Sequence, residues 1–384
     1  MARALREHEN ELFPEADRLE GFPHPRFTRR LFGHAEAEAQ LAAGLAAGRL
    51  HHAWMLVGPE GIGKATLAYR FAKRALTPTA VTADAGLFGE EAPSAASLDV
   101  APESRATRLV EALSHPDLLV LRRPYDMRAK RLRTAITVDE VRRLRGFLGH
   151  RVSGGAHKVV IVDAADELNV NAANALLKAL EEPPPQVVFL LICSMPGRIL
   201  TTIRSRCRVL PLQPLEPADI EAAAREAFEA AEVETPAPED WPALIQAAGG
   251  SVRRLLTLAS DDGVGLARQV ERLIGHASRP DWLGVHQIGD VLSGAQEAPT
   301  FETFTELLLS RLGRIIRAAA TGAGEAADRD LAARLGVGDD LASWAELWET
   351  LVRDKALQGT LNLDRKAFVL DVARRLERLA ARRS

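Results

Sequence analysis

The period of the apolar positions changes near the middle of this chain. In the first part, short continuous apolar runs rich in branched residues alternate with amphipathic stretches, which predicts buried strands separated by helices. The expected strands are, in chain order, residues 54–57, 118–121, 158–162, 187–192 and 208–210. Strands that alternate with helices in this way are typical of a three-layer α/β domain with a parallel sheet.

From Glu216 onward the pattern is helical throughout, with a first block at 216–276 and a second beginning near Pro280. Helices of the second block carry apolar stripes with the spacing of one helix face. These stripes are Phe301, Phe304, Leu308, Leu312 and Ile315; then Trp344, Leu347, Trp348 and Leu351; then Val369, Val372, Leu376 and Leu379. They predict the core of a helical bundle, and an oligomer interface is the alternative for the two tryptophans.

Composition narrows the classes of protein. A chain of 384 residues is long enough for two or three domains. A net charge of −3 argues against a protein whose whole surface binds nucleic acid. The two cysteines, Cys193 and Cys207, are too few for a disulfide framework or a four-cysteine zinc site. Neither a membrane-spanning apolar run nor the apolar segment of a secretory signal is found, so a cytoplasmic location is expected.

The stretch at 58–65, GPEGIGKA, lies between an expected strand and an expected helix, which is the context of a phosphate-binding loop. Its glycines let backbone N–H groups face an anion, and the helix N-terminus adds positive charge. Lys64 is placed to reach the outer phosphates. The next residue is Ala65, where the phosphate-loop pattern has a hydroxyl that binds magnesium. A tight turn that only connects strand and helix is the alternative.

The third expected strand ends in Asp163, the place of an aspartate that orients magnesium in a phosphate-loop ATPase. Ala164 follows, where such an enzyme has a glutamate that activates the attacking water. Asp166 and Glu167 come later, and we expect them to cap the next helix. Since the hydroxyl at Ala65 is also missing, the sequence predicts that this chain does not hydrolyse nucleotide well by itself.

Two basic segments are candidates for contacts with partners. Arg206 follows the fourth strand and its loop, where an arginine can reach a neighbouring subunit's nucleotide; such a finger is worth roughly 10³–10⁵ in rate. A surface ion pair is the alternative for Arg206. Residues 122–133 carry six basic residues and one acidic residue, the best local candidate for a contact with a phosphate backbone. A solvated loop is the alternative there.

These motifs resemble the bacterial clamp-loader subunits of the AAA+ family. The strings that carry the resemblance are RLHHA at 49–53, GPEGIGK at 58–64, NALLKALEEPP at 174–184 and TIRSRC at 202–207. The resemblance covers residues 31–260 strongly and the C-terminal third less specifically. Motor subunits of the family keep the hydroxyl after the loop lysine and the acidic pair after the third strand, and this sequence departs from both, as is common in the delta-prime branch of the family. Residues 77–107 lack the cysteines of the small zinc module that family members usually carry there.

The resemblance implies an architecture and a function. The first two parts are an N-terminal arm at 1–30 and an AAA+ P-loop domain at 31–215, which has a parallel five-stranded sheet between helices. A loop insertion at 77–107 interrupts this domain. A small helical lid at 216–276 and an all-α collar at 280–384 follow. The implied function is a stator that helps load the sliding clamp on primed DNA during replication and supplies Arg206 to a neighbouring ATPase subunit. Such a chain is part of the DNA polymerase III holoenzyme, a DNA-directed DNA polymerase, without being catalytic alone.

The resemblance also assigns partners and site residues. The partners are the motor and delta-type subunits of the clamp loader, the sliding clamp and primed DNA, and no membrane is expected. The residues around the nucleotide pocket are Gly58, Gly61, Gly63, Lys64, Asp163, Ser194 as the sensor and Arg253 as the lid arginine. ATP binding is left open, and neither zinc nor another bound metal is expected. An ATP-hydrolysing motor subunit and a standalone DNA-binding module are the alternative functions.

Overall fold

A computed structural model describes residues 14–78, 97–152, 157–260, 263–294, 298–361 and 364–381. Much of the expected insertion, at 79–96, and the first 13 residues of the expected arm lie outside the described residues. The chain forms two compact units. The first contains Met1–Thr235 and Gly250–Arg253, and the second contains Pro236–Gly249 and Arg254–Ser384. The division into arm, AAA+ domain, lid and collar stays a prediction.

The first unit is built on a five-stranded parallel sheet with the order β2-β5-β6-β1-β7. Its strands are β1 (Ala53–Val57), β2 (Leu118–Arg122), β5 (Lys158–Asp163), β6 (Val187–Cys193) and β7 (Arg208–Pro211). Each of them falls where an apolar run predicts a strand. The predicted parallel five-stranded sheet between helices, followed by a helical C-terminal part, is confirmed.

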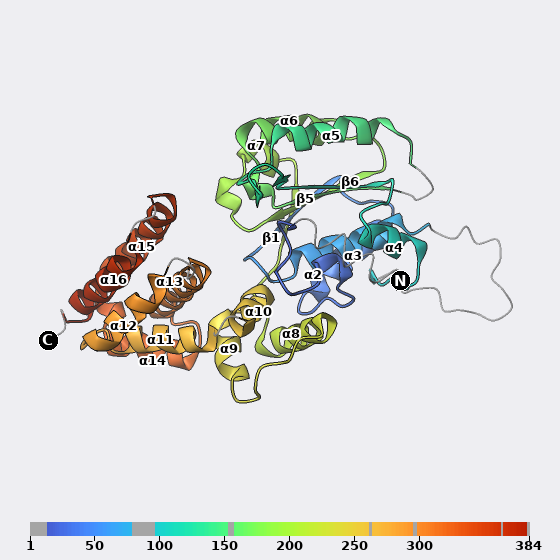
Figure 1. The fold of residues 1–384 in the computed structure, drawn as a ribbon. Coiled ribbons are helices and arrows are strands. Elements are labelled where there is room, and N and C mark those ends of the chain that lie inside the picture. The colour runs from blue at the N-terminus through green and yellow to red at the C-terminus, as the bar shows by residue number, and fades with distance from the viewer. Residues whose placement is uncertain are drawn as a thin grey trace. The chain divides into compact units, whose positions relative to one another are not determined.

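Helices cover both faces of this sheet (Figure 1). One face packs against α2 (Ala35–Ala46), α3 (Lys64–Leu76) and α4 (Arg105–Glu111), and the other against α5 (Val138–Gly149), α6 (Val170–Glu181) and α7 (Thr201–Arg204). The smaller elements of this unit are η1 (Pro25–Phe27), the hairpin strands β3 (Tyr125–Asp126) and β4 (Arg131–Leu132), η2 (Ala165–Glu167) and η3 (Pro196–Arg198). The helix α8 (Pro217–Ala231) follows β7. The central strands are buried on both faces, as their uninterrupted apolar runs predict.

The second unit is helical. Its elements are α9 (Trp241–Ala248), most of α10 (Val252–Ser260), α11 (Gly263–Gly275), α12 (Trp282–Leu292), α13 (Ala298–Thr321), α14 (Ala326–Leu335), η4 (Val337–Asp340), α15 (Leu341–Leu361) and α16 (Arg365–Ala380). The stripe of α13 is fully buried, and so is Trp344. The indole of Trp348 donates to the Leu309 carbonyl over 2.9 Å. The prediction of a bundle core is therefore confirmed. Among the described residues, no helix combines the length and the apolar composition that crossing a bilayer requires.

Candidate functional site

The glycine loop connects the carboxyl end of β1 to the first turn of α3, as predicted. Gly61 and Gly63 have φ values of +77° and +105°, a region that favours glycine. A Cβ atom on Gly61 would also overlap the side chains of Ser251 and Arg253. Sterics therefore explain two of the loop's glycines without reference to a ligand.

Lys64 is buried and folds back onto its own loop. Its Nζ atom donates to the carbonyl of Gly58 over 2.7 Å and also to the carbonyl of Pro59. Burial lowers the pKa of this ammonium group, while the nearby carboxylates of Glu60 and Asp163 act in the opposite direction. The cation that the sequence places for phosphate binding is therefore already engaged by backbone oxygens.

Asp163 ends β5 at the same edge of the sheet, and its side chain is buried. Asp17 is close enough to Asp163 for its charge to act on this carboxyl group. Burial and the charge of Asp17 raise the pKa of Asp163 well above its usual range, against the weaker influence of Arg122 and Lys64. A carboxyl group in this environment holds its proton more tightly than one that serves as an ionised ligand.

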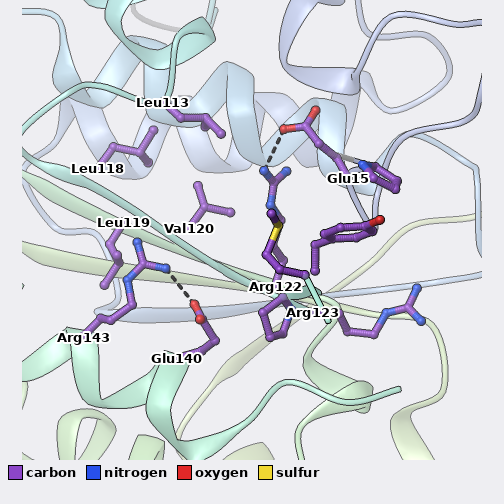
Figure 2. A pocket seen from close by; sticks show the side chains of 13 residues that line it. Glu15, Leu113, Leu118, Leu119, Val120, Arg122, Arg123, Glu140 and Arg143 are labelled. Carbon is purple, nitrogen blue, oxygen red and sulfur yellow. Dashed lines mark hydrogen bonds and ion pairs between the residues drawn. The ribbon is translucent and has the colours of Figure 1, made fainter. Parts of the chain in front are cut away.

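Asp17 belongs to the N-terminal arm. The sequence predicts no site residue in this segment. The carboxylate of Asp17 lies 2.6 Å from Nε2 of the buried His24 and 3.1 Å from the guanidinium of Arg122 at the end of β2. Arg122 also pairs with Glu15 over 2.7 Å, as Figure 2 shows. Burial opposes ionisation of Glu15, but Arg122 and Arg26 hold the pKa of Glu15 below its usual value.

Ser194, the predicted sensor, directly follows β6. Its backbone N–H donates to one oxygen of Asp166 over 3.2 Å, and the N–H of Met195 donates to the other over 3.0 Å. Asp166 therefore ties the turn η2 to the end of β6. Glu167 instead pairs with Arg123 over 2.7 Å.

The expectation that Asp166 and Glu167 cap the next helix is wrong. The N-cap of α6 is Asn169, whose side chain accepts a hydrogen bond from the N–H of Ala172 over 2.8 Å. The reason is that η2 separates the acidic pair from the helix and turns both side chains toward other strands and loops.

Arg253, the predicted lid arginine, lies against the glycine loop within the first unit. Its backbone N–H donates to the Gly61 carbonyl over 3.3 Å, and its guanidinium lies 3.3 Å from the carboxylate of Glu60. The neighbouring Ser251 donates its hydroxyl to the Glu60 carbonyl over 2.8 Å. The structure thus brings Arg253 together with the predicted loop residues.

Arg206 follows α7, and it contacts residues of α6 and α7. Its guanidinium donates to the Thr202 carbonyl over 2.8 Å and pairs with Glu181 over 2.7 Å. The side chain is about one-third exposed, at 34%. The surface ion pair weighed from the sequence is present, and the group remains accessible at the surface. A role of Arg206 toward another subunit stays a prediction.

The basic stretch at 122–133 divides into two parts. Arg122 and Arg123 are paired with acidic side chains, as described above. Residues 125–132 form the β3–β4 hairpin, and its turn is held by the carboxylate of Asp126, which accepts from two backbone N–H groups. The cations Arg128, Lys130 and Arg131 are exposed on this hairpin. Their contact with a phosphate backbone stays a prediction.

The pocket drawn in Figure 2 lies along β2 and not at the glycine loop. It has a volume of about 490 Å³ and an apolar floor of Leu118, Leu119 and Val120, with Arg143 and Glu140 paired at one side. A second pocket of about 210 Å³ lies between the arm and α8. Glycine-loop residues line neither of these two pockets.

The residues at the loop fit magnesium nucleotide poorly. Ala65 offers no side-chain oxygen to a metal ion, Lys64 is bound to carbonyls, and Asp163 is buried with a raised pKa that disfavours its ionised form. Within the described ranges, no group of three or more histidine, cysteine, aspartate or glutamate side chains is arranged to hold a metal ion. No catalytic step through a bound nucleotide can be assigned to this pocket.

Comparison with known proteins identifies relatives of the first unit. Residues 33–216 match the family described as DNA polymerase III, delta subunit. The delta-prime subunit of DNA polymerase III from Pseudomonas aeruginosa is 42% identical over 156 residues, and that from Bacillus subtilis is 34% identical over 173 residues. These alignments cover 41% and 45% of this chain and the same shares of the relatives. The chain thus matches less than half the length of these curated relatives.

More distant relatives align over longer stretches. The tau subunit from Escherichia coli is 29% identical over 256 residues, which is 65% of this chain and 36% of tau. Among solved structures, a gamma subunit-related protein from Thermotoga maritima aligns over 89% of this chain and 99% of its own, with a TM-score of 0.40 and 16% identity. The sequence matches confirm the resemblance to clamp-loader subunits of the delta-prime type.

Proposed function

We propose that this chain, whose residues 33–216 match the family described as DNA polymerase III, delta subunit, is a delta-prime-type stator of a clamp loader. In this role it helps other subunits load a sliding clamp on primed DNA during replication. Its own pocket does not hydrolyse nucleotide. It supplies Arg206 to the nucleotide of an adjacent motor subunit, and its helical C-terminal part serves in oligomerisation.

The observation that carries the proposal is the placement of Arg206. The guanidinium lies at the surface directly after α7, held by a carbonyl and by one half-exposed carboxylate. A half-exposed ion pair is weak, so the arginine can exchange Glu181 for a phosphate oxygen at small cost. Arginine also matches phosphate through two parallel hydrogen bonds, which favours it for contacts in trans.

The state of the glycine loop supports the same proposal and disfavours the motor alternative. A motor needs Lys64 free for phosphate and an ionised acid near magnesium. Here Lys64 bonds to the carbonyl of Gly58, and Asp163 is buried against Asp17. The energy of hydrolysis must then come from another subunit.

The test uses the complete clamp loader assembled with Arg206→Ala, Arg206→Lys or, as a control, Arg204→Ala. Arg204 is exposed and stands two positions away, so its removal matches the loss of surface charge. We expect the DNA-stimulated ATPase and clamp loading to fall steeply with Arg206→Ala, toward the roughly 10³-fold effect of a lost finger. Arg206→Lys should recover little, because an ammonium group cannot reproduce the planar fork.

Assembly of each complex is checked by size-exclusion chromatography, so that a loss of activity is not confused with a loss of binding. Full activity in an assembled Arg206→Ala complex would falsify the finger role. Equal losses for Arg204→Ala and Arg206→Ala would assign the effect to general surface charge.

A further inference from the structure

The N-terminal arm enters the edge of the sheet where phosphate-loop proteins place their nucleotide. The carboxylate of Asp17 lies 3.1 Å from the guanidinium of Arg122 at the end of β2, and its backbone carbonyl lies 3.5 Å from the guanidinium of Arg253. The charge of Asp17 also acts on Asp163 at the end of β5. Arg253 in turn rests on the carbonyl of Gly61 within the glycine loop. The acidic side chain of Asp17 thus lies between the strand end and the residue that covers the loop.

We propose that the arm residues 15–24 are the built-in occupant of this pocket and exclude nucleotide from it. The carboxylate of Asp17 takes the negative charge and the volume that nucleotide phosphates would otherwise bring to this edge. The inference concerns the pocket of this chain and does not depend on its role toward other subunits.

The cationic side chains around the arm are paired with carboxylates of the arm. Arg122, at the end of β2, contacts both Glu15 and Asp17, and His24 contacts the second oxygen of Asp17. A triphosphate entering here would meet the negative charge of Asp17, while the nearby cation Arg122 is already paired. Like charges at close range in a poorly hydrated site repel strongly, so entry requires that the arm first leave.

Two aromatic contacts hold the arm in this place. The ring of Phe22 packs edge to face on Phe228 of α8, with 5.5 Å between the ring centroids, and Phe22 is almost fully buried. The ring of His24 packs in the same manner on Tyr69 of α3 at 5.3 Å. Because both contacts bury apolar surface, the arm is part of the folded core rather than a loosely attached tail.

The test is a titration of the isolated full-length chain with a fluorescent ATP analogue, with and without magnesium. Wild type is compared with Asp17→Asn, with the double variant Glu15→Gln/Asp17→Asn, and with the control Glu20→Gln, an exposed acid of the same arm. We expect no saturable binding to wild type or to the control. Removal of the Asp17 charge should raise affinity by at least about tenfold, with a further gain in the double variant.

Circular dichroism and thermal unfolding establish that each variant is folded before it is titrated. Saturable binding to wild type in the range of cellular ATP, abolished by unlabelled ATP, would overturn the inference. So would folded single and double variants that bind no better than Glu20→Gln, because the arm carboxylates would then not be what keeps nucleotide out.

Discussion

The guanidinium of Arg206 lies 2.7 Å from Oε1 of Glu181, the last residue of α6. The two side chains are 34% and 48% exposed, so water reaches both partners. The pair therefore orients the Arg206 side chain but leaves it free to exchange partners. Glu181 competes with any phosphate that Arg206 would meet on another subunit, and this competition can be measured.

Glu181→Gln should leave the stability of the chain nearly unchanged, because an exposed pair contributes less than about 1 kcal/mol. In the assembled complex, the DNA-stimulated ATPase should equal or exceed that of wild type, since the arginine is released from its competitor. Steady-state ATP hydrolysis at saturating primed DNA measures this. A loss as deep as that of Arg206→Ala would instead show that the ion pair acts as a unit.

Lys64→Met should destabilise the chain. In an ATPase the same change would instead be expected to act on nucleotide binding and hydrolysis. Two loop carbonyls lose a charged donor, at a cost of about 1–3 kcal/mol. Urea unfolding of wild type and variant gives the difference. Lys178→Met, at an exposed position of α6, is the control and should remain within about 0.5 kcal/mol of wild type. A loop that tolerates Lys64→Met without loss would mean that these carbonyls find other donors.

Gly58→Ala and Gly146→Ala should have opposite effects on stability. A Cβ atom at Gly58 would overlap the backbone carbonyl of Leu212, which cannot rotate away, whereas a Cβ atom at Gly146 meets no atom within 4 Å. Gly146 lies inside α5, where alanine is favoured over glycine by roughly 0.5–1 kcal/mol. Thermal unfolding should show a lower midpoint for Gly58→Ala and an equal or higher midpoint for Gly146→Ala. The same sign for both variants would contradict the steric argument.

Asp163→Asn should stabilise the chain increasingly as the pH rises from 5 to 8. The pKa of Asp163 is raised by burial and by Asp17, so the folded state keeps a proton that the unfolded chain releases. Stability that depends on this proton is present at low pH and is lost as pH rises through the raised pKa. Chemical denaturation at several pH values measures the difference in the free energy of unfolding between wild type and Asp163→Asn. A difference in the free energy of unfolding that does not change with pH would argue against the raised pKa of Asp163.

The strands and the glycine loop could be predicted from sequence because they follow local rules. A run such as 159–162 is apolar at every position, as expected of a strand that is buried on both faces. The places of Lys64 in the loop and of Arg253 beside it could be predicted because both residues lie within the part of the chain that resembles the family.

The arm could not be predicted in this way. Asp17 pairs with Arg122 across 105 positions, and a buried charge leaves no periodic signal in the sequence. The prolines and charges of residues 14–30 are also typical of a solvated segment, yet Phe22 and His24 are buried. Asp166 illustrates the same limit: its partners are backbone N–H groups at 194 and 195, which no side-chain pattern reveals.

The carboxylate of Asp166 joins the turn after β5 to the end of β6, and the chain then runs through η3 and α7 to Arg206. The start of this connection is clamped by that carboxylate, and its end is held at Thr202 and Glu181. A tilt of the central strands would therefore carry the guanidinium along with it. In the proposed role, the reach of Arg206 toward a neighbouring subunit would then depend on the ends of β5 and β6 as well as on its own surface contacts.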